Sequence, residues 1–188
     1  MNFYDAFMGP LESKALGRLR KALITPITGT VLEIGAGTGV NLQYYQDVKL
    51  TITDKELSPN LLKSLEKNNA PIVSVACDVG MLPFEDETFD FIVSTLVFCS
   101  VEDVQRGLSE LHRVLKKGGR FIFIEHVLPA EQPSRLIFDA VTPVWSRLAG
   151  GCHLNCDFIA SVKESAMVLD EVEYAMGTKF VAGTATKP

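Results

Sequence analysis

The segment Val31-Leu-Glu-Ile-Gly-Ala-Gly-Thr-Gly39 joins a short apolar stretch to three glycines spaced two residues apart. An apolar strand that ends in glycines and leads into a helix places backbone N–H groups and a helix N-terminus beside a ligand. Dinucleotide-binding enzymes use Gly-x-Gly-x-x-Gly, whose third glycine allows close packing of helix on strand. Here position 40 is Val, so the third glycine comes one residue early. This spacing predicts a nucleotide-type turn and disfavours a nicotinamide-dependent dehydrogenase, which stays open as an alternative.

Carboxylates lie within and after the apolar stretches on either side of this turn. Glu33 interrupts the first stretch, and a charged group in a buried strand is costly unless it has a function. Asp54 and Glu56 follow the next apolar stretch, about 20 residues downstream, where a carboxylate can accept both ribose hydroxyls. We favour Glu56 for that role because it immediately precedes Leu57-Ser58-Pro59, a helix start.

Apolar strands alternate with amphipathic helices along most of the chain. We expect strands over 30–34, 50–53, 72–76, 89–96 and 120–127, and helices over 8–23, from Ser58, and from Ser100 to Gly118-Gly119. In the third helix Ser100 and Asp103 resemble a capping box. This alternation predicts one α/β domain in which helices cover both faces of a parallel sheet.

The order of elements changes after residue 129. We expect a helix over 134–148 and another that runs to about residue 169, followed by strands over 172–176 and 180–186. Only three residues separate the two strands, whereas a parallel crossover needs a dozen or more. The chain therefore ends in an antiparallel hairpin.

Composition excludes several classes of partner. The 188 residues fit one domain, and 18 basic against 23 acidic side chains give a net charge of -5, which disfavours nucleic acid. The sequence has no secretory signal and no apolar run long enough to cross a bilayer, so we expect a cytoplasmic protein with reduced cysteines. Cys152-His153-Leu-Asn-Cys156 lacks the four ligands of a structural zinc site, so no metal is expected.

Four linked segments resemble the motifs of class I S-adenosylmethionine-dependent methyltransferases. They are the glycine turn from Glu33, Glu56-Leu-Ser-Pro-Asn60, Cys77-Asp-Val-Gly-Met-Leu-Pro-Phe84 with Phe89-Asp-Phe-Ile-Val93, and Arg113-Val-Leu-Lys-Lys-Gly-Gly-Arg120. Together with Asn2-Phe-Tyr-Asp-Ala-Phe-Met-Gly-Pro10 and Gly39-Val-Asn-Leu-Gln-Tyr-Tyr45, they are similar to the branch that includes quinone, phospholipid and thiol methyltransferases. The resemblance extends over nearly the whole chain.

The resemblance implies a Rossmann-like, seven-stranded, mostly parallel sheet in the order 3-2-1-4-5-7-6, with strand seven antiparallel. Residues 1–188 would form a single methyltransferase domain. Within it, residues 1–25 would be an N-terminal helical cover, and residues 130–170 a helical insertion beside the substrate.

The resemblance also implies that S-adenosylmethionine is the cofactor and which residues hold it. The residues facing the methionine portion would be Glu33, Gly35, Gly37, Gly39 and Thr95. Glu56 would take the ribose hydroxyls, Asp78 would accept the adenine amino group, and the Val79 N–H would lie near the ring. Tyr4, in the N-terminal cover, is a weaker candidate.

The expected reaction is in-line methyl transfer to a small-molecule or lipid-like acceptor, namely a thiol, amine or quinol. The donor is already activated, so alignment and exclusion of water can supply much of the acceleration. A general base matters only if the acceptor arrives protonated, and the candidates are His126 and His153. A cofactor-binding module without catalysis remains the other alternative.

Overall fold

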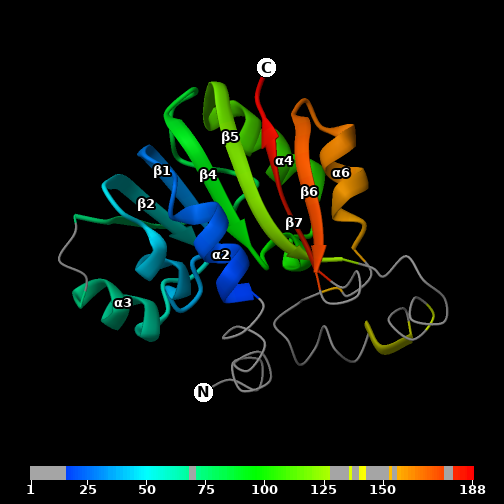
Figure 1. Cartoon of the computed structure of the whole chain (residues 1–188). Helices are drawn as coiled ribbons and strands as arrows, with labels where there is room; N and C mark the ends of the chain where they lie inside the picture. Colours follow the sequence, from blue (N-terminus) through cyan, green and yellow to red (C-terminus); the bar gives the residue numbers. More distant parts are fainter. Residues whose placement is uncertain are drawn as a thin grey trace.

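The computed structural model describes residues 16–67, 71–127, 136, 140–142, 153, 156–175 and 180–188. Its strands form one seven-stranded sheet in the order β3-β2-β1-β4-β5-β7-β6 (Figure 1). The pairings among β1 to β5 are parallel, and β7 runs antiparallel to both β5 and β6. The strand order, the direction of β7 and the closing hairpin confirm the sequence-based expectations.

The strands occupy the apolar stretches of the sequence. They are β1 Gly29–Ile34, β2 Val48–Asp54, β3 Val73–Ala76, β4 Phe89–Thr95, β5 Leu115–His126, β6 Val168–Ala175 and β7 Phe180–Thr186. The α-helices are α2 Gly17–Ile24, α3 Pro59–Glu66, α4 Val104–Val114 and α6 Phe158–Glu164, and two 3-10 helices are η2 Val40–Tyr44 and η3 Phe98–Ser100.

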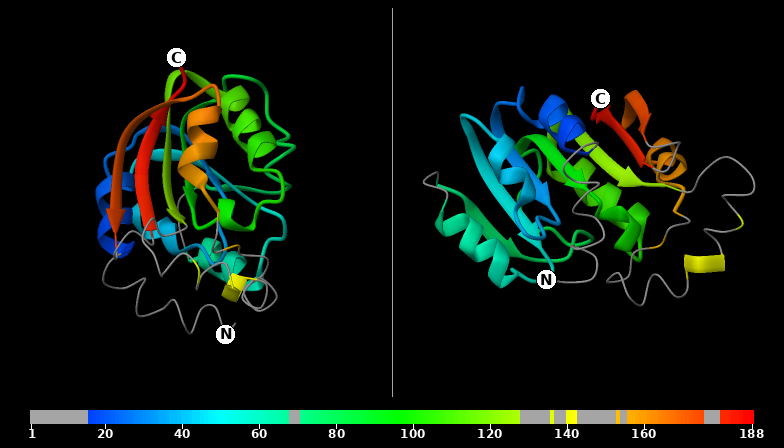
Figure 2. Two further views of the ribbon diagram at one scale, coloured as in Figure 1. Left: turned by 90° about the vertical axis from the view of Figure 1, so that its right-hand side faces the viewer. Right: turned by 60° about the horizontal axis from the view of Figure 1, so that its bottom comes forward.

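Helices cover both faces of the sheet, as the left view of Figure 2 shows for α2 on one side and α4 and α6 on the other. On the first face, Ile24 of α2 and Leu61 of α3 are fully buried in one cluster with Val93 of β4. On the second face, Leu108 of α4 and Phe158 of α6 belong to the largest core cluster. The sheet is therefore buried on both sides, as its apolar strands require.

The boundaries of α4 differ from the expectation. The N-cap is Asp103, whose Oδ1 accepts the Arg106 N–H at 2.9 Å, and Ser100 instead ends η3. The helix ends at Val114 and β5 begins at once, so Gly118-Gly119 lies inside a strand. The C-terminal segment causes this difference, because Gly118 N–H donates to Lys187 O and Lys187 N–H donates to Gly119 O. These ladder bonds override the helix-stop pattern.

The helix expected to reach residue 169 is also shorter. It is α6, which ends at Glu164, and β6 begins at Val168, opposite Thr186 of β7. Pairing along the edge of the sheet thus takes residues that their apolar spacing assigned to a helix. Residues 136 and 140–142 are helical, in agreement with the helix expected over 134–148; its remaining residues, and residues 1–15, lie outside the described residues.

Candidate cofactor site

The glycine turn follows β1 at the edge of the sheet where the parallel strands end, which is where open α/β sheets bind ligands. Gly35, Gly37 and Gly39 have positive φ angles of 61°, 59° and 82°. A Cβ on Gly35 would lie 2.4 Å from Cγ2 of Val97, whereas a Cβ on Gly37 would meet no atom of the described residues closer than Gly35 O at 3.9 Å. The turn is thus packed beneath Gly35 and open beyond Gly37, a shape that fits a ligand lying against the backbone.

Neighbouring segments fix the turn. Gly37 N–H donates to Asp54 Oδ2 at 2.8 Å, and Ser58 Oγ donates to Gly37 O at 2.9 Å. Asp54 therefore shapes the turn, while the nearby Glu56 side chain is exposed and makes no hydrogen bond with the described part of the chain. Asp54 thus has a structural task, and Glu56 stays the predicted ribose ligand.

A buried polar cluster lies behind the turn, between α2, η2 and the sheet. Asn41 Nδ2 donates to Glu33 Oε1 at 2.9 Å and to Thr95 Oγ1 at 3.0 Å. Arg20 Nη1 donates to Asn41 Oδ1 and, at 3.3 Å, to Thr95 Oγ1. The structure therefore brings the predicted residues Glu33 and Thr95 together, and it adds Arg20 and Asn41, which sequence reasoning missed.

The hydrogen bonds of the Glu33 carboxylate only partly replace the water that this group loses on burial. Glu33 is 1% exposed, and among the described residues neither its Oε2 nor the neighbouring Tyr45 hydroxyl completes a hydrogen bond of ordinary geometry. Burial raises the pKa of Glu33 to about 7, although Tyr45, Asn41 and the Arg20 charge act in the opposite direction. The cluster therefore holds a carboxyl group that changes charge near neutral pH.

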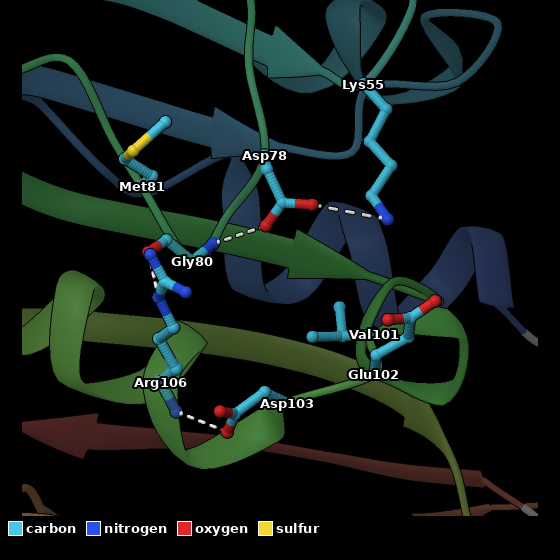
Figure 3. A pocket seen from close by; sticks show the side chains of 8 residues that line it. All are labelled: Lys55, Asp78, Gly80, Met81, Val101, Glu102, Asp103 and Arg106. Carbon is cyan, nitrogen blue, oxygen red and sulfur yellow. Dashed lines mark hydrogen bonds and ion pairs between the residues drawn. The ribbon is translucent and has the colours of Figure 1, made fainter.

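Asp78 lies at the end of β3, beside a surface pocket of about 320 Å³. Its Oδ1 accepts the Gly80 N–H at 2.8 Å, and its Oδ2 lies 3.2 Å from Lys55 Nζ, so that Lys55 and Asp78 face each other in Figure 3. The Gly80 N–H is the main cause that holds the pKa of Asp78 below its usual value, with Lys55 assisting. Val79 is buried beneath this loop. An ionised acceptor thus stands where an amino-bearing ring is predicted to bind.

The two candidate bases occupy different places. His126 ends β5, is partly buried, and packs edge-to-face on Phe180 with ring centroids 5.1 Å apart. The His153 side chain is exposed, and its backbone N–H donates to Cys99 O at 2.6 Å, next to the turn that follows β4. Both lie near the edge that carries the glycine turn, and their roles remain predictions. Tyr4 lies outside the described residues.

The described residues carry neither a metal site nor a membrane-spanning helix. No three His, Cys, Asp or Glu side chains there gather as a metal site. Among the same residues, no helix is both long and apolar enough to cross a membrane.

The sheet order, the open glycine turn after β1 and the carboxylates after β2 and β3 together define a class I S-adenosylmethionine-dependent methyltransferase. The glycine turn stays the predicted cradle for the cofactor, with buried Glu33 behind it and Asp78 after β3.

Known proteins agree with this class. Residues 32–123 match the family model described as a methyltransferase domain. The chain is 37% identical over 173 residues to a thiol S-methyltransferase of Mus musculus, covering 81% of this chain and 70% of that protein. It is 31% identical over 139 residues to a demethylmenaquinone methyltransferase of Renibacterium salmoninarum, covering 72% and 59%. The chain belongs to the class I S-adenosylmethionine-dependent methyltransferases.

The match to other relatives is shorter. A thiol S-methyltransferase of Rattus norvegicus is 38% identical over 135 residues, which is 67% of this chain and 54% of that protein. The chain thus spans about half of the length of this relative. Among solved structures, a Haloferax volcanii putative methyltransferase complexed with the Trm112 activator has a TM-score of 0.74 at 14% identity, covering 100% and 99% of the two chains, which supports the fold.

Proposed function

We propose that this chain transfers the methyl group of S-adenosylmethionine to a small or lipid-like acceptor, and that a thiol is the first acceptor to test. The observation that carries the reaction class is the open glycine turn, which lies on one sheet edge with Glu33 and Asp78. Thiol S-methyltransferases of rat and mouse, at 38% and 37% identity, support the thiol. Amines and quinols remain alternatives, because phosphatidylethanolamine and demethylmenaquinone methyltransferases are also similar.

In this proposal the cofactor lies across the carboxyl ends of the strands. Its methionine portion faces Gly37 and the Glu33 cluster, which is the buried polar cluster of Arg20, Glu33, Asn41 and Thr95. The Glu56 carboxylate, exposed at the end of β2, receives the ribose hydroxyls, and Asp78 receives the adenine amino group. The positive charge of the donor is matched by Glu33 once its carboxyl group is ionised.

When bound, the cofactor supplies an activated methyl group on a sulfonium. The protein then has to align the acceptor and exclude water, a contribution on the order of 7–11 kcal/mol in well-oriented reactions. A thiol reacts as its thiolate, so a base that takes the thiol proton increases the rate near neutral pH. His126 and His153 are the residues that we propose for this task, since both lie near the carboxyl edge of the sheet.

The direct experiment has two stages. Calorimetric titration should show that the folded protein binds S-adenosylmethionine and its demethylated product in preference to NAD. A panel of alkyl thiols, alkyl amines and quinols should then yield the demethylated product with thiols alone. Turnover with quinols or amines would replace the proposed acceptor, and binding without turnover on any acceptor would favour a non-catalytic module. A folded protein that binds NAD and neither form of the cofactor would overturn the proposal.

Asp78→Ala is expected to weaken cofactor binding by about 1–3 kcal/mol, because it leaves a donor of the adenine unpaired. The measurement is a calorimetric titration with the demethylated cofactor. Asp86→Ala is the matched control, since Asp86 also pairs with a cation, Arg113, and its side chain is 74% exposed in the following loop. Equal affinity of Asp78→Ala and the control would remove Asp78 from the site.

A further inference from the structure

Glu125 is a fully buried carboxylate that the function described so far does not use. Glu125 lies on β5, directly before His126, on the face of the sheet that α4 and α6 cover. It is 0% exposed. Burial of a carboxylate is costly unless donors replace the lost water. The donors here come from β4 and from the turn that follows it.

These donors converge on both oxygens of Glu125. Ser94 Oγ donates to Oε1 at 2.5 Å, Val97 N–H donates to Oε2 at 3.0 Å, and Phe98 N–H donates to Oε2 at 3.1 Å. The Val97 and Phe98 donors are backbone groups of consecutive residues. The carboxylate therefore fixes the path of the chain as it leaves β4, rather than the orientation of one side chain.

The backbone conformation that Glu125 fixes after β4 is unusual for residues other than glycine. Leu96 has a φ of 60°, in the left-handed region, and its N–H donates to Ile124 O at 2.8 Å. A non-glycine residue in this region persists only where surrounding contacts hold it. After Leu96 the chain reverses toward η3, and the hydrogen bonds of Val97 and Phe98 to Glu125 hold that reversal.

The reversal brings Val97 against the glycine turn. Cγ2 of Val97 lies 2.4 Å from the place where a Cβ on Gly35 would stand, so only the absence of a side chain lets the two segments meet. Thr95, which ends β4, belongs to the Glu33 cluster on the other side of the same turn. The position of the turn after β4 thus determines how the glycine turn is supported at Gly35.

We propose that Glu125 is a positioning residue for methyl transfer: through the Val97 and Phe98 N–H groups it holds the turn after β4 against Gly35 and so fixes the glycine turn. The inference rests on the proposed function, because that proposal places the methionine end of the cofactor against the glycine turn. In this proposal Glu125 acts through Val97 and Phe98. Its removal therefore shifts Val97 and misaligns the glycine turn even when the sheet stays folded.

The test compares Glu125→Ala and Glu125→Gln. The glutamine oxygen can accept both N–H groups while its amide group donates to Ser94 Oγ, which can also act as an acceptor. We expect Glu125→Ala to lose about tenfold or more in affinity for the demethylated cofactor, and Glu125→Gln to stay within about threefold of the original protein. Each protein is measured at the same interval below its own unfolding midpoint.

Asp90→Ala is the matched control. At the opposite end of β4, Asp90 Oδ2 also accepts a backbone N–H, from Thr30 at 2.8 Å, and a hydroxyl, from the same residue at 2.6 Å. This variant should lose stability and keep its cofactor affinity. A folded Glu125→Ala with unchanged affinity, or equal losses in Glu125→Ala and Asp90→Ala, would overturn the positioning role. If the unaltered protein binds no cofactor, the proposed function itself fails.

Discussion

Gly35→Ala is expected to abolish cofactor binding and to lower the free energy of unfolding by about 2–5 kcal/mol. A left-handed residue with a Cβ costs roughly 1–2 kcal/mol, and overpacking adds about 1–3 kcal/mol. Both apply at Gly35, whose φ is 61° and whose new Cβ would lie 2.4 Å from Val97. Chemical denaturation measures the loss of stability. Calorimetric titration measures the loss of cofactor binding, where a loss of at least about 100-fold in affinity corresponds to roughly 2.7 kcal/mol.

Substitutions at two other glycines separate the effect of backbone strain from the effect of blocking the ligand. Gly37→Ala meets no described atom closer than 3.9 Å, so it should cost only the left-handed strain and still lose binding, because its Cβ occupies the space of the ligand. Gly118→Ala has the same strain, at a φ of 71°, with no atom of the described residues within 4 Å and no predicted place in the site. It should keep full affinity. A Gly35→Ala protein that folds and binds like Gly118→Ala would contradict the proposed cradle.

Most of the fold followed from local patterns, and the errors lie where distant segments compete for the backbone. The continuous apolar strands, and the three residues between the strands expected over 172–176 and 180–186, predicted the sheet and its hairpin. Gly118-Gly119, in contrast, is a helix stop by composition and yet lies inside β5. Its hydrogen bonds go to Lys187, 68 or 69 positions away in the chain, so no local window contains the cause.

In the site, too, local sequence patterns identify some residues, and only the packing of distant segments identifies others. A charge that interrupts an apolar strand marks Glu33, and the structure buries this residue in a polar cluster. The pattern at Glu125, after Phe121-Ile-Phe-Ile124, is the same and marks a second buried carboxylate. Arg20 could not be found this way, because an arginine on an amphipathic helix is usually solvated. Only the packing of α2 on the sheet brings it to Asn41 and Thr95.

Glu33→Gln is expected to raise the free energy of unfolding at pH 8 and to leave it nearly unchanged at pH 4.5. The folded pKa of about 7 exceeds the ordinary value of 4.5, so the folded state binds the proton more tightly than the unfolded chain. The stability from this group is complete below pH 4.5 and is lost as the pH rises through 7. A pKa difference of this size corresponds to about 3 kcal/mol in the free energy of unfolding. Glutamine avoids this loss of stability because it does not titrate.

Asp90→Asn is the control for this pH dependence. Lys116 and Thr30 lower the pKa of Asp90 to about 2, so its contribution to stability is lost only in acid, as the pH falls from about 4 through 2. Between pH 5 and 8 the difference between Asp90→Asn and the original protein should be constant, whereas the difference for Glu33→Gln should grow. A constant difference for Glu33→Gln over that interval would show that Glu33 stays ionised when buried.

Glutamine at position 33 is expected to stabilise the protein at pH 8, so stability alone does not account for the glutamate. We attribute its presence to binding of the cofactor. The cofactor carries a sulfonium and an ammonium, and a nearby carboxylate that is otherwise poorly compensated gains most from such a charge. Added S-adenosylmethionine should therefore raise the unfolding midpoint of the original protein more than that of Glu33→Gln, by a margin that grows from pH 5 to pH 8. Equal shifts at both pH values would mean that the Glu33 charge does not contribute to cofactor binding, and its burial would then serve the glycine turn alone.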